Sequence, residues 1–250
     1  MKLEEFLERY VFVRKCVGCG ERMGYEYREE AFCSACRISF ERAKADCCTE
    51  CARSMSECRC IPKSLSSAGV LDYRKLFAYR KVNINRPQNK MIYFLKHNKN
   101  KRVALFLARQ MVNLIDEMAA TNDVDLKNAV ITYIPRTKRS YSKYGVDQSK
   151  LVASAIAEIS SLECLPLIKR MGNPRTEQKS LDLKGRARNV GKAFTIDYEL
   201  LAKSGKSTVI IFDDIVTSGA SMAKAAKLLR GCNVEKIYAI SAAYAIKEKR

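Results

Sequence analysis

One stretch near the end of the chain restricts the fold more than any other part. Four apolar residues, 209–212, precede two acids, Asp213 and Asp214, which are followed by a loop of small and hydroxyl residues at 217–221 and a helix-forming segment at 222–229. The apolar run has the length of a buried strand. In an open parallel sheet, ligands bind beyond the carboxyl ends of the strands, where the acids and the loop would lie. The stretch therefore predicts a buried strand, a ligand-binding loop and a helix.

The loop has the composition of an anion site. Its residues are Thr217, Ser218, Gly219, Ala220 and Ser221. Successive backbone N–H groups at a helix N-terminus can hold a phosphate, and a glycine lets the backbone come close to it. The two carboxylates before the loop can accept hydrogen bonds from a sugar diol, or hold a divalent cation through water. The alternative is a buried strand and a capped helix in which both acids are merely solvated.

Residues 209–221 closely resemble the phosphoribosyl-pyrophosphate (PRPP) motif of type I phosphoribosyltransferases. The resemblance implies that Asp213 and Asp214 hold the ribose hydroxyls, as catalytic residues, and that the loop holds the 5′-phosphate. It also implies that the pyrophosphate of PRPP lies with Mg²⁺ near 135–139, where Arg136 supplies positive charge.

Cysteines define a second feature, because nine of the eleven lie between Cys16 and Cys60. The first set is Cys16, Cys19, Cys33 and Cys36, two CxxC pairs that are thirteen residues apart. Two such pairs complete a tetrahedron around zinc. Disulfides are the alternative, but no export signal is seen, and cytosolic thiols stay reduced.

The second set is less regular and consists of Cys48, Cys51, Cys58 and Cys60, with Cys47 left over. We expect it to hold a second structural zinc. Both sets fall in residues 1–62, a segment too small to hold a core without metal. We therefore expect a zinc ribbon module at 1–62 and an α/β domain at 63–250, joined by a linker at 61–67.

The net charge of +19 is unevenly distributed. Residues 1–62 contain 11 basic and 11 acidic side chains, whereas residues 63–250 contain 35 and 16. Such an excess favours a polyanionic partner such as nucleic acid, although a basic proteome would also explain it. No apolar run approaches the roughly 20 residues of a membrane-spanning helix, and the first residues do not form a signal peptide, so we expect a cytoplasmic protein.

Sequence patterns between these features predict an α/β fold with a parallel sheet. The expected strands lie at 70–79, 129–134, 164–168, 193–196 and 236–243, the expected helices at 87–97, 101–119 and 147–161, and an expected basic loop at 136–145. Tyr133, Tyr141 and Tyr144 lie near the basic loop and would be able to stack on bases.

The whole chain resembles the ComF competence family, in which cysteine knuckles precede a phosphoribosyltransferase-like domain. The matching segments are Leu95-Lys96-His97, Gly145-Val146-Asp147-Gln148 and the flexible-loop pattern Thr176-x-Gln178-x-x-Leu181-x4-Arg186-x-x-Asn189-Val190-x-x-Ala193-Phe194. The resemblance implies that Gln178, Arg186 and Asn189 belong to a flexible loop that closes over the site. Tyr144 stands where the family usually has arginine, and Val146 and Asp147 replace an aromatic residue and asparagine.

The resemblance implies a role in the uptake of transforming DNA, through binding of single-stranded DNA on the cytoplasmic side. Basic segments at 136–150 and 169–192 would then follow the phosphate backbone. One alternative is an active phosphoribosyltransferase in nucleotide salvage, whose acceptor base the residues do not identify. Another is a zinc-ribbon adaptor that docks a competence helicase or an uptake-channel protein.

Overall fold

The structure, a computed structural model, describes residues 6–7, 11, 13–80, 85–171, 194–232 and 234–246. Its strands are β1 (Tyr73–Tyr79), β2 (Ala129–Tyr133), β3 (Glu163–Cys164), β4 (Ile168–Arg170), β5 (Phe194–Ile196), β6 (Thr208–Val216) and β7 (Lys236–Ala245). Its α-helices are α2 (Ser34–Ala45), α3 (Lys63–Ser66), α4 (Pro87–His97), α5 (Lys101–Asn122), α6 (Lys138–Tyr144), α7 (Gln148–Ile159), α9 (Tyr198–Ser204) and α10 (Ala220–Arg230), with short 3-10 turns at Tyr25–Tyr27 and Leu126–Asn128.

Five strands form a parallel sheet in the order β1-β7-β6-β2-β3, which confirms the predicted fold class. Strand β6 lies at the centre, between β2 and β7. Its first five residues are all buried, as expected of a strand covered on both faces. From β2 the chain runs outward to β3, whereas from β6 it runs the other way to β7. The strand order therefore reverses between β2 and β6, where open α/β sheets bind ligands.

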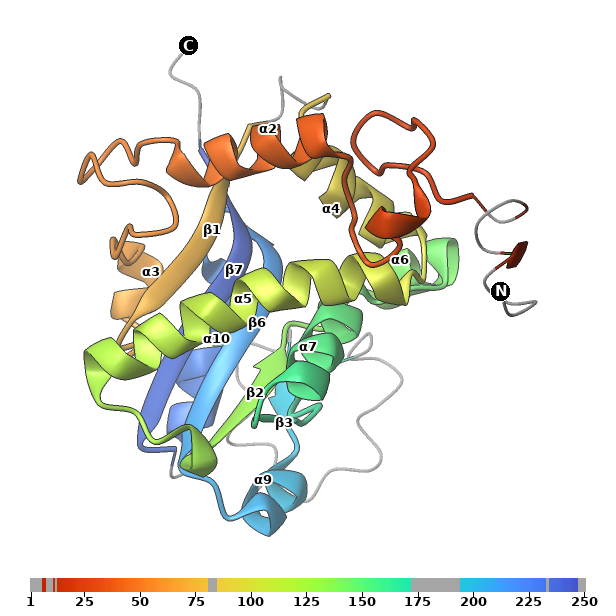
Figure 1. Cartoon of the computed structure of the whole chain (residues 1–250). Helices are drawn as coiled ribbons and strands as arrows, with labels where there is room; N and C mark the ends of the chain where they lie inside the picture. Colours follow the sequence, from red (N-terminus) through yellow and green to blue (C-terminus); the bar gives the residue numbers. More distant parts are fainter. Residues whose placement is uncertain are drawn as a thin grey trace.

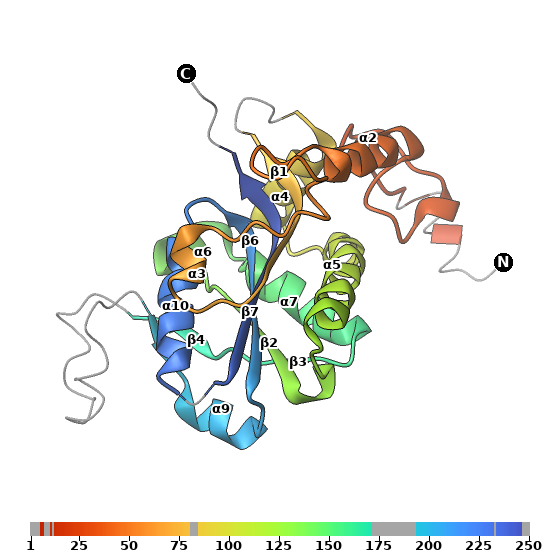
Figure 2. The same cartoon turned by 90° about the vertical axis from the view of Figure 1, so that its left-hand side faces the viewer.

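Helices cover both faces of the sheet (Figures 1 and 2). In Figure 2 the sheet is seen on edge, with α5 and α7 on one side and α3 and α10 on the other. Each face has its own core: residues of α5 and α7 pack with Phe212 of β6, and residues of α10 pack with Ile211, the preceding residue of that strand. Neighbouring residues of β6 therefore point into opposite cores.

The cysteine-rich segment packs against the edge strand β1. Helix α2 buries Cys36, Phe40 and Ala43 on one face. The ring of Phe40 meets the rings of Phe77 on β1 and Phe106 on α5, at centroid distances of 5.9 and 5.5 Å. One hydrophobic core therefore includes residues from both sides of the predicted domain boundary. The division into 1–62 and 63–250 stays a prediction.

Three sequence-based assignments differ from the structure. The predicted linker contains α3, whose Leu65 is fully buried. The expected loop at 136–145 holds helix α6, because Thr137 caps its N-terminus and Gly145 ends it in the left-handed conformation. The expected strand at 164–168 is divided between β3 and β4, because Pro166 has no N–H group to continue a ladder.

Strands β4 and β5 pair antiparallel in a separate two-stranded sheet. The chain between them includes residues 172–193, so the predicted flexible-loop residues Gln178, Arg186 and Asn189 lie outside the described residues. Within the described ranges, no helix has the length and apolar character needed to cross a membrane.

The shared core makes a prediction about stability. Phe40→Ala should lower the free energy of unfolding by about 3–5 kcal/mol, because it leaves a cavity between α2, β1 and α5. Ile38→Ala is the matched control, since Ile38 lies on the same helix and is 56% exposed. Denaturant unfolding, followed by a probe in each predicted domain, measures both variants. A Phe40→Ala variant in which only the cysteine-rich segment is destabilised would contradict the shared core.

Candidate functional site

The acid pair lies in the last part of the central strand, at the reversal point of the sheet. The structure extends β6 through Val216, so Asp213 and Asp214 are strand residues beside β7. The neighbouring strand β2 ends at Tyr133 and leads into Pro135 and Arg136. The acids therefore face the start of the segment that was expected to hold a pyrophosphate.

Both carboxylates are held by side chains that are distant in sequence. Ser149 donates its hydroxyl to Asp213 over 3.2 Å, and the Gln148 amide donates to Asp214 over 3.2 Å. The ammonium of Lys96 lies 3.3 Å from Asp214. Sequence reasoning found the segments around Lys96 and Gln148 but gave these residues no role, and it missed Ser149. Their proximity to the acids depends on how α4 and α7 pack.

Burial gives Asp213 an unusual carboxyl group. Removal from water, together with the adjacent Asp214 carboxylate, raises the pKa of Asp213 well above its ordinary value. The buried Oε1 of Gln148 has no hydrogen-bond partner among the described residues. Buried polar groups are rarely left unsatisfied, so this oxygen is a candidate contact for a ligand or an ordered water.

The loop after β6 has the geometry of an anion site. Gly219 has φ +73° and precedes the first residue of α10. A side chain at Gly219 would also come within 2.8 Å of the Ser64 hydroxyl, so this position requires glycine for two reasons. Ser64, on α3, donates to the carbonyl of Ser218 over 2.5 Å. The predicted linker thus holds the loop in place.

A small cavity of about 70 Å³ lies within this turn of chain. Its lining includes Asp213 and all five predicted loop residues: Thr217, Ser218, Gly219, Ala220 and Ser221. Thr217, Ser218 and Ala220 are exposed, whereas Gly219 is buried beneath them. The structure therefore brings the loop and the first acid of the pair to one place.

Arg136 lies at the rim of the site and is partly occupied by other contacts. Its Nη1 donates to the carbonyls of Lys96 and Val146 over 2.7 and 2.9 Å, and its guanidinium lies 4.7 Å from the centre of the Tyr144 ring. A guanidinium has five N–H donors, so others remain for an anion. Tyr144 therefore provides an aromatic face for Arg136.

Arg170 is a second cation at the site that sequence reasoning did not single out. Its Nε donates to the carbonyl of Pro135 over 2.6 Å. Burial lowers the pKa of Arg170, and the charge of Asp213 acts in the opposite direction. The cation therefore lies near enough to the acid pair to interact with it.

The expectation that Tyr133 stacks on bases is wrong. Only 6% of Tyr133 is exposed, because both faces of β2 are covered. Burial raises its pKa to about 12. Tyr141 is 54% exposed, so burial does not exclude stacking there. Tyr144 is half-buried, and its ring contacts Arg136 and Lys143.

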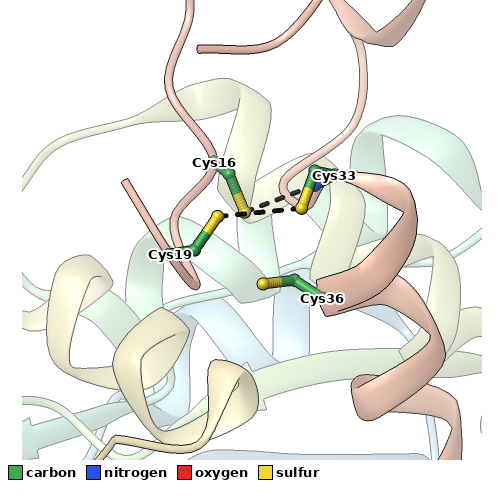
Figure 3. Close-up of side chains that lie close together, drawn as sticks. All are labelled: Cys16, Cys19, Cys33 and Cys36. Atoms are coloured by element: carbon green, nitrogen blue, oxygen red, sulfur yellow. Dashed lines mark hydrogen bonds between the residues drawn. The ribbon is translucent and has the colours of Figure 1, made fainter. Parts of the chain in front are cut away.

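The first cysteine set converges as predicted (Figure 3). Cys16 and Cys19 come from a hairpin turn, and Cys33 and Cys36 come from the start of α2. All four sulfurs lie within 4.8 Å of one another. The sulfurs of Cys19 and Cys33 are 3.7 Å apart, which is close to the edge of about 3.8 Å that Zn–S bonds of about 2.3 Å give a tetrahedron. All these cysteines are free thiols, so the set fits zinc and not disulfides.

The second set converges in the same way, on Cys48, Cys51, Cys58 and Cys60. The sulfurs of Cys51 and Cys58 are 3.5 Å apart. The short spacing of Cys58-x-Cys60 therefore does not prevent four ligands from meeting. Cys47 is exposed and stays outside the set, as expected.

The two hairpin turns share one hydrogen-bond pattern. In the first, the Cys16 N–H donates to Glu21 and the Gly20 N–H donates back to Cys16. In the second, the Cys48 N–H donates to Arg53 and the Ala52 N–H donates back to Cys48. The corresponding residues Gly20 and Ala52 have φ of +84° and +59°. The second turn therefore places alanine in a conformation that favours glycine.

Both cysteine sets have features that suit metal-bound thiolates. Although burial raises it, hydrogen bonds from the backbones of Cys19 and Cys33 bring the pKa of Cys16 down to about 7, whereas burial and the neighbouring Cys16 raise the pKa of Cys36. At the second set, the buried ammonium of Lys75 donates to the carbonyl of Cys60 over 3.0 Å. Either set could hold structural zinc, and Lys75 places a positive charge beside the second one.

Comparison with known protein families finds no match. Among curated proteins, the chain is similar to the DNA utilization protein YhgH of Shigella flexneri, with 25% identity over 143 residues. The alignment covers 57% of this chain and 61% of that protein, which is less than two thirds of its length. The name of that protein associates it with the use of DNA.

The turn geometry predicts unequal zinc sites. Ala52→Gly should slow the release of zinc from the second set about fivefold, because alanine with positive φ costs roughly 1 kcal/mol that glycine does not. Gly20→Ala should speed release from the first set by a similar factor. Competition with a chromogenic chelator, after metal analysis of protein purified without chelators, measures both rates. Identical release from Ala52→Gly and the unmodified protein would exclude strain at this turn.

The raised pKa of the half-buried Asp213 predicts a pH dependence. Because its pKa is raised, folded Asp213 keeps a proton that the unfolded chain has lost. The free energy of unfolding therefore falls as the pH rises from the ordinary aspartate pKa of about 3.9 through the raised value. Asp213→Asn cannot ionise and should be more stable than the unmodified protein, by a margin that grows across this window. Denaturant unfolding at several pH values tests this, with exposed Asp116→Asn as the control, and a constant margin would contradict it.

Proposed function

We propose that this chain binds PRPP with Mg²⁺ at the acid pair and the 217–221 loop, and that it acts in the handling of single-stranded DNA on the cytoplasmic side of the membrane. One observation carries the first part. A buried carboxylate, Asp214, and the half-buried Asp213 beside it are both hydrogen-bonded and adjoin a glycine-led helix N-terminus at the point where the strand order reverses.

The chemistry of the site matches the parts of PRPP. Backbone N–H groups of 218–221 would bind the 5′-phosphate at the positive end of α10. Asp213 and Asp214 would accept hydrogen bonds from the two ribose hydroxyls. The pyrophosphate would lie towards Arg136 and Arg170, and Mg²⁺ would offset part of its charge.

The same arrangement suits phosphoribosyl transfer. A nitrogen of an acceptor base would attack C1′ as the bond from C1′ to the pyrophosphate oxygen breaks, and pyrophosphate would leave with the electron pair. The carboxylates would stabilise the positive charge that develops on the ribose, so catalysis would come from positioning and electrostatics. Release of pyrophosphate in the presence of an acceptor distinguishes an enzyme from a protein that only binds PRPP.

Two observations support the role in DNA handling. The related protein is named for DNA utilization, and the chain carries a net charge of +19 that lies entirely in residues 63–250. Zinc in the two cysteine sets would be structural. It would supply the cross-links that hold a segment without a large core of its own.

The PRPP site predicts the behaviour of a double variant. Asp213→Asn with Asp214→Asn should weaken PRPP binding roughly tenfold for each charged hydrogen bond that is removed, because each such bond contributes about 1.5 kcal/mol or more. Asp116→Asn with Glu117→Gln is the control, since it removes two adjacent acids that are exposed on α5. Isothermal titration with PRPP and Mg²⁺ measures both. Equal affinity in the two double variants would place PRPP elsewhere.

A further inference from the structure

We propose that a basic groove between the first cysteine turn and helices α4 and α5 holds single-stranded DNA; this deepens the proposed role in DNA handling and rests on it. We call it the knuckle groove. Its volume is about 960 Å³, and it is formed by residues 13–20 on one wall and by α4, the turn at 98–100 and the start of α5 on the other.

The groove collects positive charge from both walls. Six cationic side chains line it: Arg14, Lys15, Lys90, Lys99, Lys101 and Arg102. Among the described residues, no acidic side chain lines it. The cations of the first wall, Arg14 and Lys15, belong to residues 1–62, in which basic and acidic side chains balance. The groove therefore gathers positive charge even from a segment that is neutral as a whole.

Half of these cations, Lys15, Lys90 and Lys99, are available to a ligand. Lys101 pairs with Glu158 over 2.8 Å, and Arg14 donates to the carbonyl of Arg28. Arg102 is half-buried, and its buried Nη1 has no acceptor in the described part of the chain, so this atom is closed to a ligand. No salt bridge to Lys15, Lys90 or Lys99 is formed by the residues that the structure describes. Cys16 and Cys19 also line the groove. A zinc held by four thiolates would carry a net negative charge, but the positive charge of the six cations is larger.

An aromatic side chain gives the groove a reason to prefer a single strand. Phe94 lines it and is half-buried, packed against the core, and the adjacent Tyr93, outside the lining, is 59% exposed. Bases stack on such rings without sequence preference, provided that they are not paired in a duplex. Cations that follow a backbone, together with rings for bases, are the two elements of single-strand binding.

The groove has rigid walls, because the cysteine turn is packed against α4. A side chain on Gly18 would lie 2.7 Å from the sulfur of Cys36 and 3.1 Å from Pro87, the first residue of α4. At the end of α4, the His97 ring meets the ring of Tyr144 on α6 at 4.5 Å. Binding of DNA would therefore use both the cysteine-rich segment and the α/β domain.

Charge reversal in the full chain tests the groove. The groove variant is Lys90→Glu with Lys99→Glu, and the control is Lys224→Glu with Lys227→Glu, two exposed lysines of α10 on the other face of the sheet. Both change the net charge equally. A glutamate at 90 suits the first turn of α4, so the fold should be retained, and Lys90→Gln with Lys99→Gln provides a milder pair. Zinc content and circular dichroism check each variant.

The readout is binding of a fluorescent oligothymidine between about 50 and 200 mM salt. The groove variant should bind at least about tenfold more weakly than the control, and its salt slope should be flatter by about 0.7 for each phosphate that the protein no longer neutralises. Phe94→Leu should weaken binding of the single strand roughly tenfold and leave duplex binding unchanged.

The possible failures are distinguishable. If the unmodified protein binds no oligothymidine at low salt, the proposed role in DNA handling fails, and the groove fails with it. If it binds but the groove and control variants show the same decrease in affinity, the assignment of the DNA site to the knuckle groove is wrong, while the proposed role in DNA handling stands. An equal decrease of single-strand and duplex binding in Phe94→Leu would overturn the stacking of bases.

Discussion

The structure depends on how the edge strand β1 is covered. An exposed, hydrophobic edge of a sheet invites pairing with other chains, so proteins cover or interrupt it. Here the cysteine-rich segment covers it: Phe40 packs on Phe77, and Ala78 lies in a cluster with Cys48, Met55 and Cys58. The segment has no large core of its own, so metal held by the cysteine sets and this contact with the sheet would stabilise each other. The same segment forms one wall of the knuckle groove and leads into α3, which holds the 217–219 turn.

The candidate site lowers the stability of the fold that carries it. Two adjacent carboxylates at the end of a buried strand repel each other, and burial penalises the ionised form of Asp213. The structure offsets this with donors from Ser149, Gln148 and Lys96, yet it leaves a buried oxygen of Gln148 unpaired among the described residues. A core optimised for stability would replace such a cluster with apolar side chains. Retaining it is consistent with a ligand that supplies the missing contacts.

Features encoded within a short stretch could be predicted from the sequence, and features that depend on packing could not. The two cysteine sets and the β6–α10 turn follow from local spacing, and the structure has them at the expected residues. Ser149 was missed because its meeting with Asp213 requires α7 to pack beside β6, 64 residues away. Tyr133 was misjudged because its neighbourhood in sequence is basic, whereas its strand is covered on both faces. Helix α6 was missed although Thr137 and Gly145 signal its ends, because its many charges are typical of a loop.

Helix α4 joins the two candidate sites. Its first residue, Pro87, packs against the first cysteine turn, its middle presents Lys90 and Phe94 to the knuckle groove, and its last turn sends Lys96 to Asp214. The helix has only eleven residues, so its two ends lie close together. If the first cysteine set holds zinc, removing that zinc would release the cysteine turn from Pro87 and so disturb both the groove and the ion pair at the acid site. This geometry makes the cysteine-rich segment a structural part of both sites, even though none of its residues touches the acid pair in the described parts of the chain.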